Sequence, residues 1–192
     1  MCGVTGYIHL DGRAANSEVL GAMTNLILHR GPDGSGMFIH DNVALAHTRL
    51  SIQDLSESAH QPMVDSSTGS VIVFNGEIYN FKTLRKELAS YGVRFNSTGD
   101  TEVLLACCQI FGVEKTLPML NGMFSFAFFD GRNKALWLAR DRMGIKPLYY
   151  SVQGKNLWFA SEQKPILSQM PKVECNELAI STTLSGGAVW EP

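Results

Sequence analysis

The chain has 192 residues, which suits one domain with a hydrophobic core large enough to fold without disulfides or metals. Its formal net charge is −2 with both signs interspersed, so it offers no basic face to a nucleic-acid backbone and no polybasic run to a membrane. Because it also lacks a signal-type N-terminal segment and a long apolar run, we expect a cytoplasmic protein with neither nucleic acid nor membrane among its partners.

The first half of the chain predicts short strands around one helix. Strands are expected over residues 3–9, 35–40, 43–49 and 71–74. An apolar pattern of helical spacing begins at Ser17 and ends before His29. A turn at Asn75-Gly76 is expected to end the fourth strand.

The second half predicts two helices and further strands. The helix over residues 78–91 has an amphipathic pattern, and the helix over 100–111 is apolar enough to indicate deep burial. Strands are expected over residues 123–130, 134–139, 148–152 and 156–160. Short connections between consecutive strands favour antiparallel pairing, and grouped strands with few helices favour an α+β fold.

The cysteines give no sign of a disulfide framework or a metal site. They are Cys2, Cys107, Cys108 and Cys175. Cys107 and Cys108 are neighbours in a helical pattern, which is poor geometry for pairing with each other, and no CxxC spacing appears. Since the last three cysteines have no activating partner in the sequence, we interpret them as buried, inert thiols.

Cys2 is different because it follows Met1 and precedes a glycine. Removal of Met1 would leave a residue that carries a thiol and a free α-amine together. An N-terminal nucleophile obtains its general base from its own amine, and the two kinds of group titrate within about one pH unit of each other. Such a chain needs no catalytic histidine.

Polar clusters follow Cys2 in the sequence. They are HRGPD at 29–33, HTRLSI at 47–52, NGEIYN at 75–80 and GDTE at 99–102. Each alone has a structural explanation, with Arg49 as a cation at a strand end, Asn75 as a turn residue and Asp100 as the N-cap of a helix. Their order behind Cys2 favours a functional explanation.

Together these motifs resemble class II glutamine amidotransferase domains, which are of the N-terminal-nucleophile type, and among them the glutaminase domain of asparagine synthetases. The matching segments are Cys2-Gly3 with Gly6, HRGPD, LAHTRLSI at 45–52, NGEIYN, DTE at 100–102, RDRMGIKPLYY at 140–150 and Ala160-Ser161-Glu162 with Lys164. Several motifs in one order are far more specific than any single one. The HRGPD and RLSI forms point to the asparagine synthetase branch rather than to sister families that act on sugar phosphates or phosphoribosyl pyrophosphate.

The resemblance implies a four-layer α/β/β/α sandwich of antiparallel sheets over residues 1–170, with 171–192 as the start of a linker toward a synthetase domain. It also implies glutamine hydrolysis through a thioester on Cys2. The side-chain amide of Asn75 and the backbone N–H of Gly76 would form the oxyanion hole. The α-amine of Cys2 would take the thiol proton and later deliver one to the departing ammonia.

The same resemblance implies how L-glutamine is bound. Arg49 would hold the α-carboxylate with two parallel hydrogen bonds, as a lysine could not. Asp100, helped by Glu77, would bind the α-ammonium group. Backbone groups near the next three residues would complete the pocket: Leu50, Ser51 and Ile52.

Other polar and aromatic residues are interpreted as structural. His29 and His47 are not needed as bases, since the N-terminal amine fills that role. The phenylalanines at 124, 126, 128 and 129 are interpreted as sheet core. Residues 140–142, of sequence RDR, predict a loop held by ion pairs beside the pocket, with a docking surface for a synthetase partner as the alternative.

The end of the chain carries an incomplete phosphate-loop motif. Ser185-Gly186-Gly187 begins like SGGxDS but lacks its Asp and final Ser. We therefore expect no cofactor for the glutaminase half, with ATP and Mg only in a synthetase domain outside this chain. The expected partners are L-glutamine and a synthetase domain or subunit that accepts ammonia, and a homodimer stays open.

Three alternatives stay open: an amidotransferase for a different carboxylate, a non-catalytic scaffold that keeps the fold, and an N-terminal-nucleophile acylase. The joint presence of Cys2, Arg49, Asn75, Gly76 and Asp100 argues against a scaffold. Arg49 and Asp100 as a pair favour an amino-acid substrate over a simple acyl amide.

Overall fold

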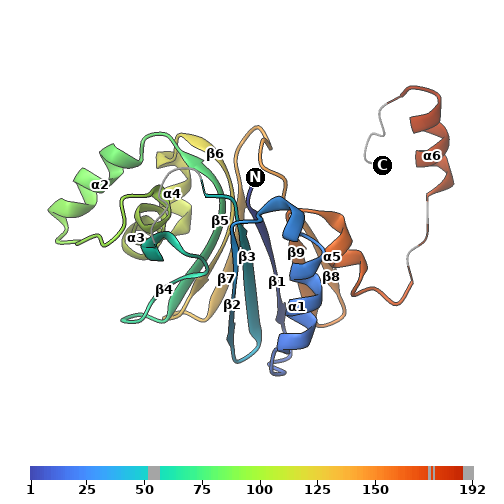
Figure 1. Ribbon diagram of the computed structural model, residues 1–192, viewed down its shortest axis with the longest axis horizontal. Helices are drawn as coiled ribbons and strands as arrows, with labels where there is room; N and C mark the ends of the chain where they lie inside the picture. The colour runs from blue at the N-terminus through green and yellow to red at the C-terminus, as the bar shows by residue number, and fades with distance from the viewer. Residues whose placement is uncertain (52–56, 173, 175, 188–192) are drawn as a thin grey trace.

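The computed structural model describes residues 1–51, 57–172, 174 and 176–187. Two antiparallel sheets lie face to face at its centre (Figure 1). The first sheet has the order β2-β3-β1-β9-β8, with bounds β1 Gly3–His9, β2 Gly34–His40, β3 Val43–Arg49, β8 Tyr149–Gln153 and β9 Asn156–Ala160. The second has the order β4-β5-β6-β7, with bounds β4 Met63–Asp65, β5 Ser70–Ile78, β6 Gly122–Asp130 and β7 Ala135–Arg140.

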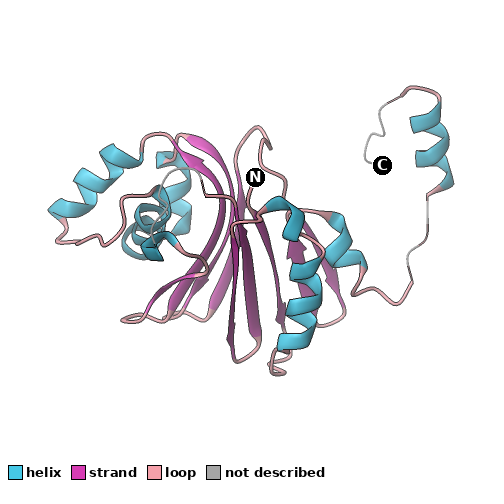
Figure 2. Ribbon diagram, in the orientation of Figure 1, coloured by secondary structure: helices cyan, strands magenta, loops and turns pink. Residues whose placement is uncertain are grey.

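Helices cover the outer face of each sheet (Figure 2). The first sheet is covered by α1 Ser17–Asn25 and α5 Gln163–Leu167, and the second by α2 Phe81–Ser90, α3 Asp100–Phe111 and α4 Val113–Met119. Short 3₁₀ helices are η1 Leu28–Arg30 and η2 Glu57–Ala59. The predicted α+β sandwich of four layers, α/β/β/α, is confirmed.

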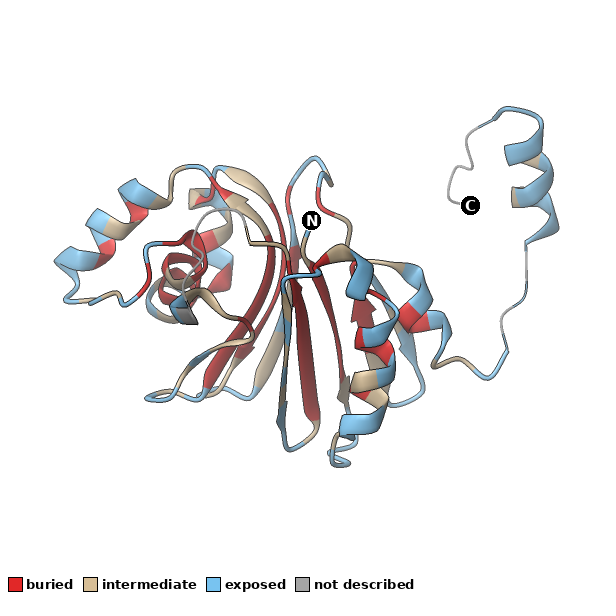
Figure 3. Ribbon diagram, viewed as in Figure 1, coloured by how far each residue is buried: buried red, intermediate tan, exposed pale blue. Residues whose placement is uncertain are grey.

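Three apolar clusters correspond to the three interfaces between these layers, and the central strands are buried almost throughout (Figure 3). Between the sheets, Val4, Val43 and Leu45 pack against Val71 and Val73. Burying side chains of this size stabilises the fold by roughly 1.5–3 kcal/mol each. The two sheets are therefore held by apolar packing at the middle of the sandwich.

Strand alternation aims polar side chains at one end of that same layer. Successive side chains of a strand point to opposite faces, so residues two apart point the same way. Leu45 lies between the sheets, and His47 and Arg49 follow it on that face of β3. Val73 also lies between the sheets, so Asn75 projects from β5 toward the opposite sheet.

Several predicted elements match the structure residue for residue. They are the strands over 3–9, 43–49 and 156–160 and the helix over 100–111. The phenylalanines of β6 are core, as predicted, and so are Cys107 and Cys108. Cys175 lies outside the described residues.

The two predicted boundaries on either side of Asn75-Gly76 and Ile78 are wrong by three or four residues, whereas most other strand ends differ by one. The strand predicted to end at Asn75-Gly76 continues to Ile78, because glycine lets β5 pass close to β6: a Cβ on Gly76 would lie 2.3 Å from the carbonyl oxygen of Met123. The helix predicted from residue 78 begins at Phe81, since residue 78 still belongs to β5.

Some short elements were not predicted from the sequence: β4, α4, α5 and α6 Glu177–Leu184. Pro118 lies inside α4, and a proline in the sequence argues against a helix there. Helix α6 lies away from the sheets in Figure 1 and exposes Leu178 and Leu184. In the described part of the chain, no helix is long and apolar enough to cross a membrane.

Candidate active site

Cys2 immediately precedes β1 and lies against the segment that leaves β3. Its Sγ is 3.4 Å from the backbone nitrogen of Leu50 and 3.5 Å from the carbonyl oxygen of the same residue. Because these are backbone atoms, the position of the thiol depends on the course of the chain rather than on a neighbouring side chain. Next to it, Met1 is 56% exposed.

The backbone of Cys2 is anchored from η1. Arg30 donates from Nε to the carbonyl oxygen of Cys2 at 3.1 Å, and its Nη1 donates to Glu162 at 3.0 Å. His29 contacts the same carboxylate oxygen at 2.9 Å. Burial alone would raise the pKa of Glu162, but the hydrogen bonds from Arg30 and His29 outweigh it and hold that pKa below its usual value. A structural part for His29 agrees with the sequence interpretation.

A cavity of about 120 Å³ opens at this end of the sandwich. Every described residue of the predicted site lines it: Cys2, Arg49, Leu50, Ser51, Asn75, Gly76, Glu77 and Asp100. Ile52 lies outside the described residues. Residues from both sheets and from α3 thus meet around one small space, as the resemblance implied.

The side chain of Asn75 is 2% exposed, yet its Nδ2 finds no hydrogen-bond partner among the described residues. Leaving a buried donor unpaired costs roughly 1–3 kcal/mol, so native proteins rarely tolerate one without a reason. An N–H donor held ready for a ligand is such a reason.

The backbone N–H of Gly76 is a second donor on the same cavity wall. Alternate residues of β5 direct their N–H groups away from β6: Phe74 donates to Gln61 Oε1 at 2.6 Å and Ile78 donates to Asp100 Oδ2 at 2.8 Å. Gly76 lies midway between them in the same register, so its N–H also points away from β6, and on that side the described part of the chain places no acceptor on it. Two unpaired donors from adjacent residues therefore line the cavity that holds the Cys2 thiol.

Charged groups form another part of the cavity lining. Arg49 is 7% exposed, and Asp100 is equally buried at the start of α3. Burial and, less strongly, the nearby charge of Glu77 raise the pKa of Asp100, although the amide of Ile78 opposes that shift. Gly99, not Asp100, is the N-cap of α3, so the capping explanation of Asp100 is wrong.

Ser51 and the cluster around Asp33 complete this edge. The backbone nitrogen of Ser51 donates to Asp33 Oδ2 at 2.7 Å, and that of Asp33 donates to the carbonyl oxygen of Arg49 at 3.0 Å. The HRGPD segment therefore shapes the start of the segment that follows β3.

Sequence reasoning missed three polar residues that line the cavity: Gln61, Thr101 and Lys146. Gln61 and Lys146 are each 8% exposed, and a buried polar side chain is the signal that a sequence alone does not supply. His47 also lines the cavity, with Nε2 3.1 Å from the carbonyl oxygen of Phe74. Burial lowers the pKa of His47 to about 3, which makes it a neutral donor to that carbonyl rather than a base.

The loop after β7 is shaped by hydrogen bonds to backbone atoms, in place of the ion pairs expected from the sequence. Asp141 accepts from the amides of Phe124 at 3.1 Å and Lys146 at 3.0 Å, and Arg140 donates to the carbonyl oxygen of Lys146. Burial would raise the pKa of Asp141, but these backbone amides hold it below its usual value. The side chain of Lys146 reaches the N-terminus, where Nζ is 3.6 Å from the sulfur of Met1.

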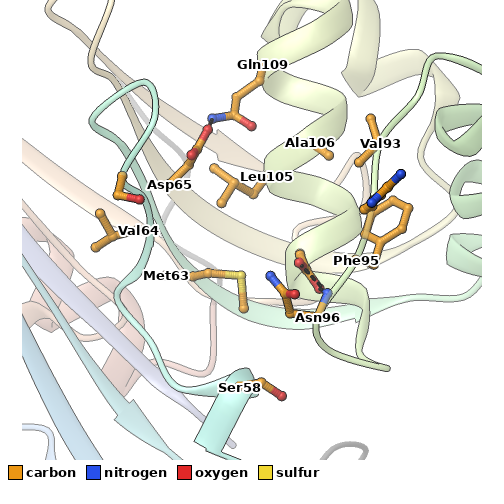
Figure 4. A pocket seen from close by; sticks show the side chains of 13 residues that line it. Ser58, Met63, Val64, Asp65, Val93, Phe95, Asn96, Leu105, Ala106 and Gln109 are labelled. Atoms are coloured by element: carbon orange, nitrogen blue, oxygen red, sulfur yellow. Dashed lines mark hydrogen bonds between the residues drawn. The ribbon is translucent and has the colours of Figure 1, made fainter.

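A larger hollow, of about 500 Å³, lies between β4 and α3 (Figure 4). Three of its polar side chains are engaged with their surroundings: Gln109 donates to Asp65 at 2.7 Å, and Glu102 accepts from the backbone of Asn96 at 2.9 Å. It contains no cysteine among its lining residues. We therefore place the chemistry at the smaller cavity.

No cluster of three or more potential metal ligands occurs in the described ranges. What the cavity does contain is a thiol, two unpaired N–H donors, a guanidinium group and carboxylates. This set can attack a carbonyl carbon, stabilise the resulting oxyanion and bind a ligand that carries one positive and one negative charge.

The fold matches that of known amidotransferases. Glutamine phosphoribosylpyrophosphate amidotransferase of Bacillus subtilis superimposes with a TM-score of 0.72 at 21% sequence identity, over 86% of this chain and 43% of that one. A second structure, of the allosteric regulatory enzyme of purine biosynthesis, gives a TM-score of 0.70 at 19% identity. The fold is that of the N-terminal-nucleophile amidotransferases.

Sequence comparison identifies the family. Residues 1–192 match the family described as glutamine amidotransferase domain, and the chain belongs to it, as a class II member. Asparagine synthetase [glutamine-hydrolyzing] 1 of Bacillus subtilis (strain 168) is 38% identical over 195 residues, which covers all of this chain and 30% of the relative. Asparagine synthetase B of Escherichia coli (strain K12) is 42% identical over 173 residues, covering 87% of this chain and 30% of the relative.

The relatives are not all asparagine synthetases. Amidase chry2 of Gibberella zeae is 37% identical over 180 residues, covering 88% of this chain and 26% of the relative. The chain thus spans less than a third of the length of these curated relatives. It is a glutamine amidotransferase domain related to asparagine synthetases.

Proposed function

We propose that this domain hydrolyses L-glutamine to L-glutamate and ammonia through a thioester on Cys2. The observation that carries the proposal is the pair of unpaired donors, Asn75 Nδ2 and the Gly76 N–H, on the wall of the cavity that holds the Cys2 thiol. Donors of this kind stabilise negative charge as it develops on a carbonyl oxygen.

The reaction begins once Met1 is removed. The α-amine of Cys2 accepts the thiol proton, the sulfur bonds to the side-chain carbonyl carbon of glutamine, and the C=O electron pair moves onto oxygen. When that oxyanion collapses, the C–N bond breaks and the ammonium group of Cys2 returns a proton to the leaving ammonia. Water then attacks the thioester carbon and gives a proton to the α-amine of Cys2; the S–C bond breaks, glutamate leaves, and that proton returns to the sulfur to re-form the Cys2 thiol.

Substrate binding uses the charged part of the cavity. Arg49 binds the α-carboxylate, and Asp100 with Glu77 binds the α-ammonium group. Backbone groups of Leu50 and Ser51 close the pocket around the ligand. A bound ammonium group also keeps Asp100 ionised, against the burial that raises its pKa.

The ammonia is passed to an ATP- and Mg-dependent acceptor domain of the asparagine synthetase type, joined to residues 1–170 through the segment that begins at 171. The glutaminase half itself uses no cofactor. The 38–42% identity to two asparagine synthetases supports this acceptor. The fungal amidase relatives support the second candidate, an acceptor with a different carboxylate.

The test is glutamate release by purified protein whose N-terminus is shown by mass spectrometry to begin at Cys2. We expect glutamate and ammonia in equal amounts, and inactivation by 6-diazo-5-oxo-norleucine with the label on Cys2. A folded, processed sample that gives neither result refutes the proposal. Protein that retains Met1 is the matched control and should be inactive, because its Cys2 has no free amine.

A further inference from the structure

Two side chains bind the backbone N–H and the backbone carbonyl oxygen of Phe74 in β5. The N–H of Phe74 donates to Gln61 Oε1 at 2.6 Å, and its carbonyl oxygen lies 3.1 Å from His47 Nε2. Both side chains are nearly inaccessible to solvent and line the cavity. Phe74 precedes Asn75 and lies two residues before Gly76, so it precedes both proposed oxyanion donors.

These side chains replace a strand that is absent at this edge. Strand β4 pairs only with Ser70–Ile72 of β5, and beyond that pairing the edge has no strand beside it in the described chain. An uncovered strand edge is free to bend or twist. Gln61 and Asp100 bind the edge amides on either side of Gly76 and so fix its direction.

We propose that Gln61 is a positioning residue for the oxyanion hole: by accepting from the Phe74 N–H, it holds the edge of β5 so that the Gly76 N–H and the Asn75 amide face the Cys2 thiol. The proposal rests on the proposed function. The hydrogen bonds of the Gln61 side chain go to Phe74 and Thr101 rather than to the thiol. Gln61 acts through the strand.

Gln61 is well fixed for this task. Its Nε2 donates to Thr101 Oγ1 at 3.3 Å on α3, which sets the orientation of the amide. Its backbone lies against β2, where a Cβ on Gly36 would come within 2.3 Å of the Gln61 carbonyl oxygen. One residue thus connects β2, β5 and α3 at the edge of the cavity.

The test compares variants that remove, retract or keep the acceptor oxygen. Gln61→Met removes it, Gln61→Asn withdraws it by one methylene, and Gln61→Glu keeps an oxygen in place. A displacement of about 1 Å costs on the order of 100-fold in rate, so we expect Met and Asn to lower kcat by about 10- to 100-fold with KM within about twofold. Gln61→Glu should stay within about fivefold of wild-type kcat.

A second measurement tests directly whether the oxyanion hole is intact. L-glutamate γ-semialdehyde, the aldehyde analogue of glutamine, bonds to the thiol and places its oxygen where the oxyanion would be. Its affinity should fall by the same factor as kcat in Gln61→Met and Gln61→Asn. The matched control is Gln109→Met, which deletes hydrogen bonds to Asp65 and Thr68 at the distant hollow and should leave kcat unchanged.

The outcomes separate the two proposals. If the wild-type, processed protein releases no glutamate, the proposed function fails. If it is active and both Gln61→Met and Gln61→Asn keep full kcat, or Gln61→Glu loses as much as they do, the positioning role is overturned. Gln61→Asn carries the same prediction if Gln61→Met does not fold.

Discussion

Replacing Asn75 with alanine should lower activity steeply while leaving stability almost unchanged. Loss of one oxyanion donor costs roughly 100- to 1,000-fold in kcat, or about 2.7–4 kcal/mol in the barrier. The effect on folding has a different origin. The Nδ2 atom is buried without a partner among the described residues, so its removal relieves a cost of roughly 1–3 kcal/mol.

That gain is offset by lost packing of the side chain, and the space left behind joins the existing cavity. We expect the free energy of unfolding of Asn75→Ala to stay within about 1 kcal/mol of wild type, or to rise. For a chain of this length that corresponds to a change in Tm of a few degrees at most, about 2–4 °C.

Asn80 provides the matched control, since it lies in the same NGEIYN segment but is fully engaged. Its Nδ2 donates to the carbonyl oxygen of Met119, and its Oδ1 accepts from the backbone of Asn121, both at 2.9 Å. Losing two such bonds costs about 1–3 kcal/mol. Asn80→Ala should therefore be less stable than Asn75→Ala and yet keep wild-type kcat.

The assays are enzyme-coupled detection of glutamate at saturating glutamine and urea unfolding of the same preparations. The reasoning is refuted if Asn75→Ala keeps its kcat. It is also refuted if Asn75→Ala loses 3 kcal/mol or more of stability, an estimate at the top of the range for a paired buried group, because its amide would then be a structural partner.

Three further predictions follow from the site and the core. Arg49→Lys should raise the glutamine KM about tenfold with kcat within about twofold, since it removes two-pronged binding of a carboxylate; a defect in kcat alone would contradict this role. Burial lowers the pKa of His47 from 6.5 to about 3, so between these values the unfolded chain binds a proton that the folded chain does not, and stability falls as the pH falls. Urea unfolding between pH 4 and 6 gives the slope of the free energy of unfolding against pH. This slope should be smaller in His47→Gln than in wild type by up to about 1.4 kcal/mol per pH unit, and equal slopes would show that His47 is protonated in the folded protein. Iodoacetamide should modify Cys2 in the folded protein, whereas Cys107 and Cys108 should react only after unfolding, because burial raises the pKa of both thiols, that of Cys107 to about 12. Peptide mass spectrometry would show which cysteines are modified.

Local patterns in the sequence were sufficient for the main strands and the α+β class, and the resemblance to a known family supplied the four layers and most of the site. Short apolar segments bounded by turn residues indicate the strands β1, β3 and β9, and the order of the polar clusters behind Cys2 indicates which of them belong together. The cavity lining then includes every described residue of that predicted site. What these residues do in the reaction stays a prediction.

The rest depended on contacts between distant segments. Asn75-Gly76 has the local signature of a turn, but β6, which begins some 46 residues later, keeps it extended. Gly76 pairs with Phe124 and Asn75 with Ser125, and only the assembled sheet reveals this pairing. Gln61 has no motif around it, and its importance appears only when its oxygen is seen on the Phe74 amide. Thr101 and Lys146 became part of the site in the same way.

The thiol and the two oxyanion donors come from different sheets. Cys2 immediately precedes β1 of the first sheet, Asn75-Gly76 lies in β5 of the second, and the apolar layer between the sheets sets their spacing. The reactive centre therefore exists only when the two halves of the sandwich have docked in their final register. The proposed glutamine hydrolysis is accordingly a reporter of assembly: during refolding it should return after each sheet has formed, and shortening Val73 or Leu45 in the shared layer should lower it although neither residue lines the cavity.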